Sequence, residues 1–200
     1  MTQLEKNEAA PPGRVKLANA VRRLLETKDY GSITTSEISR ESGVNEALIY
    51  RYFGNKRGLL HGVLAEHLQL FWEKVEHDLK GIKSTAEKLR RVIWSSINFY
   101  NQDRILSKIL LLEVRAHKDY FSSQTYRIVK KYTQLITDTI QEGVDNGELK
   151  PGVSPKNLRQ IILGSMEHLI LPAIIHDGPI DVDLVQEDIC TTIFDGVLWP

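Results

Sequence analysis

The stretch from residue 35 to residue 53 constrains the fold of this chain more than any other. Its apolar residues Ile38, Val44 and Ile49 recur at spacings that are typical of two short helices joined by a tight turn. Gly43 stands where the chain must reverse, and a positive φ costs a glycine little there. Residues suited to an N-cap precede both segments, namely Thr34, Thr35 or Ser36 for the first and Asn45 for the second. The stretch therefore predicts a helix-turn-helix element.

The second short helix predicts a surface that can read DNA. Leu48 or Ile49 would dock the helix on the rest of its domain, and the polar side chains would stay outside. A recognition helix needs this arrangement of one apolar stripe and exposed residues near its N-terminus. The residues expected on the exposed side are Asn45, Glu46, Ala47, Tyr50 and Arg51.

The distribution of charge supports a nucleic-acid partner for one end of the chain only. The net charge is zero overall, but residues 14–60 hold nine Lys or Arg against five Asp or Glu, which gives +4. Residues 61–200 hold sixteen against nineteen, which gives −3. Such a dipole would orient the N-terminal part toward phosphates. Lys56 and Arg57 at the start of the next helix oppose its dipole, and a nearby phosphate would compensate for them.

The remainder of the chain is predicted to be helical. Apolar spacing indicates helices over about 14–28, 56–80, 84–100, 103–115, 118–146, 155–176 and 182–197, with Ser84 and Glu87 as a capping box. The predicted fold class is all-α, an N-terminal three-helix helix-turn-helix domain followed by a helical bundle for ligand binding and dimerisation. The predicted domains are a flexible lead-in at 1–13, a DNA-binding domain at 14–60 and the bundle at 61–200.

Several classes of protein are disfavoured by what the sequence holds. A single cysteine, Cys190, excludes an internal disulfide framework and suits a reducing cytoplasm. The start of the chain has no apolar run like a signal peptide, and the longest apolar run, Leu169–Ile175, is seven residues, against roughly 20 for a membrane span. The six histidines lack metal-ligand spacing, and no catalytic motif is evident. We therefore expect a cytoplasmic protein that is not an enzyme and has no membrane, metal or cofactor.

The last two predicted helices are strongly apolar, which favours a homodimer in which two helices from each copy form a four-helix interface. The alternative is that both helices pack only within their own bundle. The residues predicted at the interface are Leu158, Ile162, Ser165, Leu169, Ile189, Ile193 and Val197.

A ligand pocket in the bundle is predicted from polar tips on otherwise apolar helices. The candidate lining residues are Trp72, Trp94, Tyr100, Arg115, Tyr126 and His168. For each of them a satisfied core or surface position is the competing interpretation. A pocket with many aliphatic and few charged residues suits an apolar or acyl-chain ligand, with Arg115 or His168 as an anchor for an anionic head.

Residues 14–64 resemble the tetracycline-repressor (TetR) family of bacterial regulators. The resemblance rests on Asp29-Tyr30-Gly31, on Ile33 to Ser39, on Ser42-Gly43-Val44-Asn45, and on the run from Ile49 to Leu60. It implies an all-helical homodimer that binds double-stranded DNA at a near-palindromic operator, usually as a repressor, and that a small-molecule effector releases. Relatives that sense acyl-CoA share the general character of this chain.

The resemblance also implies roles for individual residues. Thr35, Ser36 and Tyr50 would contact phosphates, and Lys56 would anchor the DNA at the start of the fourth helix. The residues that would face bases or the adjacent backbone are Asn45, Glu46, Ala47 and Arg51, with Arg51 suited to a guanine. Two positions depart from the family: Glu46 stands where Lys or Arg is common, and Leu48 where a small or polar residue is common. Two alternatives remain open, a helical interaction module with a degenerate DNA-binding helix and a DNA-binding protein that needs no ligand.

Overall fold

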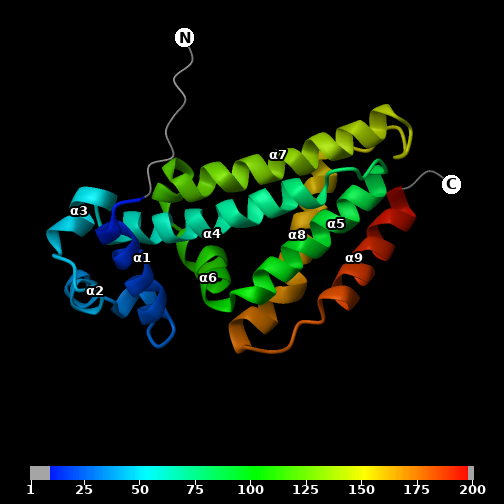
Figure 1. Ribbon diagram of the computed structural model, residues 1–200. Helices are drawn as coiled ribbons and strands as arrows, with labels where there is room; N and C mark the ends of the chain where they lie inside the picture. The colour runs from blue at the N-terminus through cyan, green and yellow to red at the C-terminus, as the bar shows by residue number, and fades with distance from the viewer. Residues whose placement is uncertain (1–9, 198–200) are drawn as a thin grey trace, which may run out of the picture. The chain divides into compact units, whose positions relative to one another are not determined.

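The computed structural model describes residues 10–197, and these form helices joined by loops and short helical turns, with no β-strand among them (Figure 1). The prediction of an all-α fold is confirmed. The chain divides into two compact units, one reaching to Ala65 and one beginning at Glu66. The sequence placed this boundary slightly earlier, after residue 60. Residues 1–9 of the predicted lead-in lie outside the described residues.

The first unit holds α1 (Pro12–Leu25), the 3₁₀ turn η1 (Tyr30–Ser32), α2 (Thr35–Ser42), α3 (Ala47–Phe53) and the start of α4 (Lys56–Asp78). Helix α1 begins two residues before the predicted start because Pro12 stands at its N-terminus, where a missing N–H and a fixed φ suit the first turn. Helices α2 and α3 both pack on α1. Leu17 and Val21 of α1, Ile38 of α2 and Ile49 of α3 form the core.

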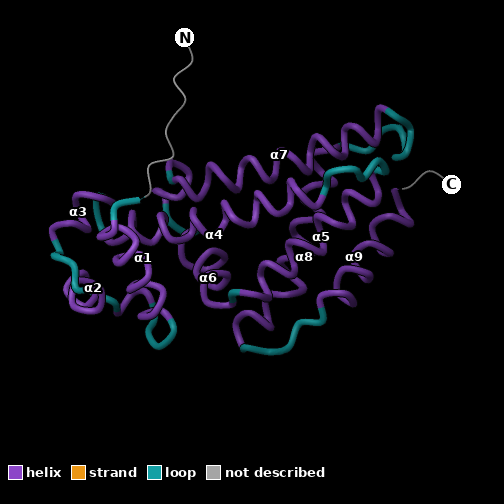
Figure 2. The backbone as a smooth tube through the Cα atoms, in the orientation of Figure 1, coloured by secondary structure: helices purple, strands orange, loops and turns teal. Residues whose placement is uncertain are grey.

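The second unit is a helical bundle. After the C-terminal part of α4 it holds α5 (Thr85–Gln102), α6 (Arg104–Lys108), a π-helical turn η2 (Ile109–Val114), a 3₁₀ turn η3 (Lys118–Ser122), α7 (Gln124–Asp145), α8 (Pro155–His176) and α9 (Val182–Val197). Helix α5 packs against α7, α8 and α9, and α8 packs against α7 and α9. Figure 2 shows the loops that separate these helices.

Two predicted helices differ in detail from the structure. The helix expected over 103–115 is the short α6 followed by the π-helical turn η2. The helix expected from residue 118 begins only at Gln124, because Ser123 caps it and accepts the N–H of Tyr126 on its hydroxyl oxygen at 3.1 Å. Both differences lie in the segment that connects α5 to α7.

The N-terminus of α5 is capped from a distant part of the chain. The hydroxyl oxygen of Ser84 accepts the N–H of Glu87 at 3.4 Å, as predicted. The carboxylate of the cap, however, belongs to Glu148, which accepts the N–H of Thr85 at 2.8 Å and the hydroxyl of Ser84 at 3.1 Å. Glu148, in the loop after α7, thus provides the capping carboxylate that the sequence assigned to Glu87.

The close approach of α7 to α5 depends on Gly143. A Cβ atom at this position would lie 2.5 Å from Cγ2 of Thr85 and 2.9 Å from Cγ of Leu149. Both distances are shorter than heavy atoms tolerate without displacement. Only a glycine lets the two helices meet at this spacing.

Four of the predicted dimer residues are buried within the chain itself, and for them the prediction is wrong. Leu158 and Ile162 of α8 and Ile189 and Ile193 of α9 belong to the core of their own unit. The error arises because an apolar helix with more than one apolar face does not reveal by periodicity which face meets its own bundle. The side chain of Val197 lies outside the described residues.

Helix α8 nevertheless keeps an exposed apolar face. Ile161 is 54% exposed and Leu169 is 52% exposed, with the half-buried Ser165 between them. Their spacing of four residues puts the three side chains on one stripe. By length and composition alone, α8 is also apolar enough to cross a membrane. Ser165 and Leu169 are thus the predicted interface residues that stay accessible.

Candidate functional site

The N-terminus of α2 is held by a capping box. The hydroxyl of Thr34 accepts the N–H of Glu37 at 3.1 Å, and the carboxylate of Glu37 accepts the N–H of Thr34 at 2.9 Å. Lys28 binds the same carboxylate at 2.6 Å, and this bond with those from Thr34 lowers the pKa of Glu37 to about 2. Thr35 and Ser36 are consequently the first two residues of α2, at the end of the helix that favours phosphate.

The turn between α2 and α3 is built by Gly43 and the side chains of Ser39 and Asn45. Gly43 ends α2 with a φ of 65°, in the left-handed region. The hydroxyl of Ser39 donates to the carbonyl of Val44 at 2.7 Å, and the carboxamide oxygen of Asn45 accepts the N–H of Ala47 at 2.8 Å. Asn45 therefore supplies the capping bond predicted for it, although Glu46 occupies the N-cap position of α3.

Helix α3 exposes the side that the sequence assigned to DNA. Ile49 is fully buried, whereas Tyr50 on the adjacent position is 52% exposed. The other predicted contact residues of this helix and its entry are exposed or half-buried, namely Asn45, Glu46, Ala47 and Arg51. Together with Thr35 and Ser36 they form what we call the recognition surface. Their contacts with DNA remain a prediction.

Lys56 is bound to the main chain of the same unit. Its ammonium group donates to the carbonyl of Ile33 at 2.6 Å and to that of Tyr30 at 3.1 Å, and it lies 4.5 Å from the centroid of the Tyr30 ring. Burial, together with the nearby charge of Arg57, lowers the pKa of Lys56. The sequence suggested a phosphate to offset the unfavourable position of a cation at a helix N-terminus. For Lys56, the two carbonyl oxygens offset it within the protein. Two of its three donors are used in these bonds, and a contact of Lys56 with DNA remains a prediction.

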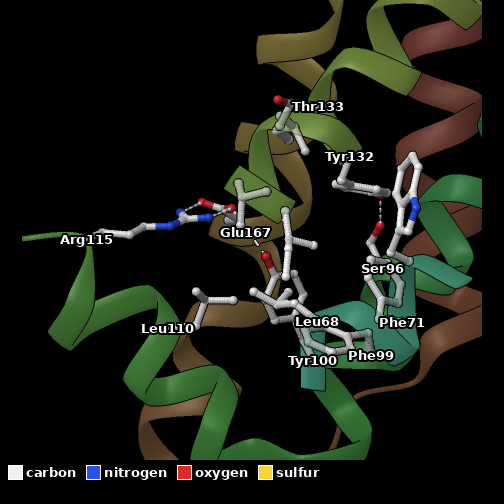
Figure 3. Close-up of a pocket in the computed structure, with 14 residues that line it drawn as sticks. Leu68, Phe71, Ser96, Phe99, Tyr100, Leu110, Arg115, Tyr132, Thr133 and Glu167 are labelled. Carbon is white, nitrogen blue, oxygen red and sulfur yellow. Dashed lines mark hydrogen bonds and ion pairs between the residues drawn. The ribbon is translucent and has the colours of Figure 1, made fainter. Parts of the chain in front are cut away.

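A small cavity lies inside the second unit (Figure 3). Fourteen residues from α4, α5, α7, α8 and the η2 segment line it, and its volume is about 50 Å³. Most of the lining is apolar or aromatic, with the ring centroids of Phe71 and Phe99 4.5 Å apart and those of Phe71 and Tyr132 5.3 Å apart. Pockets for small molecules usually span roughly 300–1,000 Å³, so a ligand would have to displace these side chains.

Two charged residues line the cavity, and they bind each other. Arg115, just after η2, donates through both terminal nitrogens to Glu167 of α8 at 2.7 and 2.8 Å. The hydroxyl of Tyr100 donates to the same carboxylate at 3.4 Å, and Figure 3 shows all three groups converging. Burial lowers the pKa of Arg115, but the bonds to Glu167 outweigh it and the pKa lies above its usual value. Burial raises the pKa of Tyr100, so the phenol stays a neutral donor.

The opposite side of the cavity carries a second polar contact. The hydroxyl of Ser96 donates to the carbonyl of Val92 at 2.7 Å, and the hydroxyl of Tyr132 is bonded to that of Ser96. Burial raises the pKa of Tyr132. The hydroxyl of Thr133 donates to the carbonyl of Lys130 at 3.0 Å. These hydroxyls are therefore engaged within the protein.

The structure brings three of the six predicted pocket residues together and leaves three elsewhere. Trp72, Tyr100 and Arg115 line the cavity. Trp94 instead donates from its indole nitrogen to Asp183 of α9 at 2.7 Å, and Tyr126 packs edge-on against Tyr120 and Phe121. His168 is exposed. These three residues do not line this cavity.

The sequence missed Glu167, the neighbour of His168 on α8. One residue corresponds to about 100° of rotation on a helix, and α8 is apolar over much of its circumference. The periodicity therefore did not show which of the two faced the interior. The signal that would have identified Glu167 is the pairing of a carboxylate with Arg115, which only the fold reveals.

Comparison with known proteins places both units in one family. Residues 17–63 match the family described as bacterial regulatory proteins, tetR family. Residues 64–196 match the family described as YsiA-like protein, C-terminal region. Together the two matches cover both compact units of the chain.

Individual relatives agree over nearly the whole chain. The fatty acid metabolism regulator protein of Bacillus subtilis (strain 168) is 25% identical over 186 residues, which are 93% of this chain and 96% of the relative. The structure of the regulator FadR from Bacillus subtilis, in complex with stearoyl-CoA, covers 91% of this chain and 98% of its own with a TM-score of 0.81 at 24% identity.

The fatty acid degradation regulator FadR from Bacillus halodurans has the same fold, with a TM-score of 0.81 at 20% identity over 94% of this chain and 98% of its own. The helix-turn-helix geometry, the bundle and both family matches agree. This chain belongs to the TetR family of bacterial DNA-binding regulatory proteins.

Proposed function

We propose that this protein is a cytoplasmic, homodimeric repressor that binds a near-palindromic operator and releases it when a long-chain fatty acyl thioester enters the cavity of the second unit. The observation that carries the proposal is the aromatic and apolar cavity, whose two charged residues neutralise each other. The relative that matches nearly the full length is named for fatty acid metabolism, which supports the same ligand class.

The DNA-binding part of the proposal rests on the recognition surface. Arg51 and Asn45 are exposed on or beside α3, where they would reach base edges in the major groove. Thr35 and Ser36 stand at the N-terminus of α2, where free N–H groups favour phosphate. Base contacts would give specificity and phosphate contacts would give affinity and register.

The homodimer rests on the exposed apolar stripe of α8. Ile161 and Leu169 would be costly to leave in water, and a second copy placed against them would bury both. Leu184 at the start of α9 is also 55% exposed and is a further apolar candidate for an interface. A symmetric dimer would present two recognition surfaces to successive major grooves, about 34–36 Å apart or a multiple of that.

The small volume of the cavity is what makes it suitable as a switch. A ligand acts on a conformational equilibrium only through a difference in affinity between two states. An acyl chain cannot fit about 50 Å³, so it would bind only a state in which rings such as Phe71 have moved. Phe71 belongs to α4, the helix that begins at Lys56 in the DNA-binding unit. Its displacement would therefore act on an element that both units share.

Selection of genomic DNA fragments by the purified protein, at low and at physiological salt, tests the proposal. Enrichment of a palindrome upstream of particular genes is expected, and the products of those genes would report the pathway. Enrichment without a motif that disappears with salt would leave only phosphate attraction and would reject a specific operator.

A further inference from the structure

We infer that Glu167 is a specificity-determining residue of the ligand cavity: by occupying Arg115 it makes the site select a neutral, esterified acyl chain over the corresponding free fatty acid. The inference rests on the proposed function and goes beyond it, because it assigns the discrimination between two forms of one chain to a single carboxylate. The juxtaposition of Arg115 and Glu167 in an otherwise uncharged cavity motivates it.

The ion pair leaves no charge for a ligand to neutralise. Both terminal nitrogens of the Arg115 guanidinium point at the two oxygens of Glu167, in the bidentate arrangement that gives the strongest such contacts. Tyr100 adds a hydrogen bond to the same carboxylate. The cavity therefore has a net charge of zero, although its wall contains an arginine.

A free fatty acid would disturb this balance. Its head is an ionised carboxylate at neutral pH. If it replaced Glu167 at Arg115, the carboxylate of Glu167 would stand unpaired beside a second anion. If it did not displace Glu167, its own charge would lie near that of Glu167 with its cationic partner already engaged.

An acyl thioester avoids both costs. Its carbonyl is neutral and needs neither the displacement of Glu167 nor a counter-ion. The phosphates of coenzyme A are separated from the carbonyl by the length of the pantetheine arm and need not enter the cavity. The wall supports this preference, because the hydroxyls of Ser96, Tyr132 and Thr133 are already engaged within the protein.

Glu167→Gln tests the inference by removing the charge and keeping the shape. The measurement is equilibrium dialysis with radiolabelled stearate, below its critical micelle concentration, and with stearoyl-CoA. We expect the wild-type protein to bind stearate at least about tenfold more weakly than stearoyl-CoA, and the variant to gain at least about tenfold in affinity for stearate, because Arg115 becomes free to pair with it.

Two further variants separate this effect from structural change. Glu167→Gln combined with Arg115→Met should lose the gain, because the cation is gone. Glu142→Gln breaks the pair between Lys88 and Glu142, which are 2.7 Å apart and do not line the cavity, and should leave stearate binding unchanged. Thermal unfolding of each variant reports whether it is folded.

The outcomes distinguish this inference from the proposed function. If the wild-type protein binds neither stearoyl-CoA nor stearate, the proposed ligand class fails. If it binds stearoyl-CoA but folded Glu167→Gln gains nothing for stearate, the proposed function stands and the role of Glu167 is refuted. A gain in Glu142→Gln of the same size would also refute it.

Discussion

The ammonium group of Lys56, the first residue of α4, donates a 2.6 Å hydrogen bond to the carbonyl oxygen of Ile33, the residue that precedes the cap of α2. The contact ties the start of the fourth helix to the entry of the helix-turn-helix. It joins residues 23 positions apart in the chain and thereby fixes the N-terminus of α2 at which Thr35 and Ser36 stand. The positive charge of Lys56 at the N-terminus of α4 thus stabilises the fold of the DNA-binding unit through hydrogen bonds to main-chain carbonyls.

Lys56→Ala should destabilise the protein and weaken its binding to every DNA sequence alike. Loss of hydrogen bonds from a charged group to two carbonyls costs about 1–3 kcal/mol of unfolding free energy. Chemical unfolding and mobility-shift titrations with operator and unrelated DNA measure the two effects, with the exposed Lys16→Ala as control. A loss of discrimination with stability unchanged would contradict this role.

The capping carboxylate of α2 should make stability depend on acid pH. The folded state holds the pKa of Glu37 at about 2, below its ordinary value of 4.5, so the stabilisation is complete above the ordinary value and is lost as the pH falls toward 2. Urea unfolding between pH 7 and pH 3 should show a smaller decline for Glu37→Gln than for the wild type. Glu26→Gln, at an exposed position, is the matched control. Equal declines in all three proteins would show that Glu37 does not cause the loss of stability at acid pH.

Gly143→Ala should destabilise the bundle by about 1–3 kcal/mol, because the new Cβ atom would overlap the methyl group of Thr85. Thr85→Ser removes that methyl group and keeps the hydroxyl, so the double variant should regain part of the loss. The cycle of four proteins, measured by chemical unfolding, gives the coupling. Additive effects would show that α5 and α7 do not meet as described.

Leu169→Glu should convert the proposed dimer to a monomer, because it places a charge in the exposed apolar stripe of α8. Sedimentation velocity measures the change. Leu70→Glu on α4 is the control, since Leu70 is also exposed but lies outside the stripe. A dimer that survives Leu169→Glu would place the interface on another face.

The sequence predicted those features that depend on neighbours in the chain. The capping of α2, the reversal at Gly43 and the burial of an apolar residue at position 48 or 49 follow from local propensity and helical spacing, and all three are present, with Ile49 as the buried residue. Features that depend on distant residues were not predictable in the same way. Glu148 reaches the cap of α5 from beyond α7, and Lys56 reaches Ile33 across the helix-turn-helix.

The cavity shows the same limit. Tyr100 and Arg115 were recognised as polar groups on apolar segments, which a sequence displays directly. The sequence favours His168 over Glu167 because the rotation of α8 about its axis is decided by packing against four other helices, α5, α6, α7 and α9. The apolar faces of α8 and α9 were confused for the same reason, so Leu158 and Ile162 were assigned to a partner although they lie in their own core.

The most direct test of the account is a titration of the protein bound to its selected operator with stearoyl-CoA, followed by fluorescence anisotropy of the labelled DNA. The DNA should be released at a concentration of stearoyl-CoA comparable to its dissociation constant, and coenzyme A alone should not release it. DNA that stays bound at saturating stearoyl-CoA would contradict the proposed switch and leave a DNA-binding protein that does not respond to this ligand.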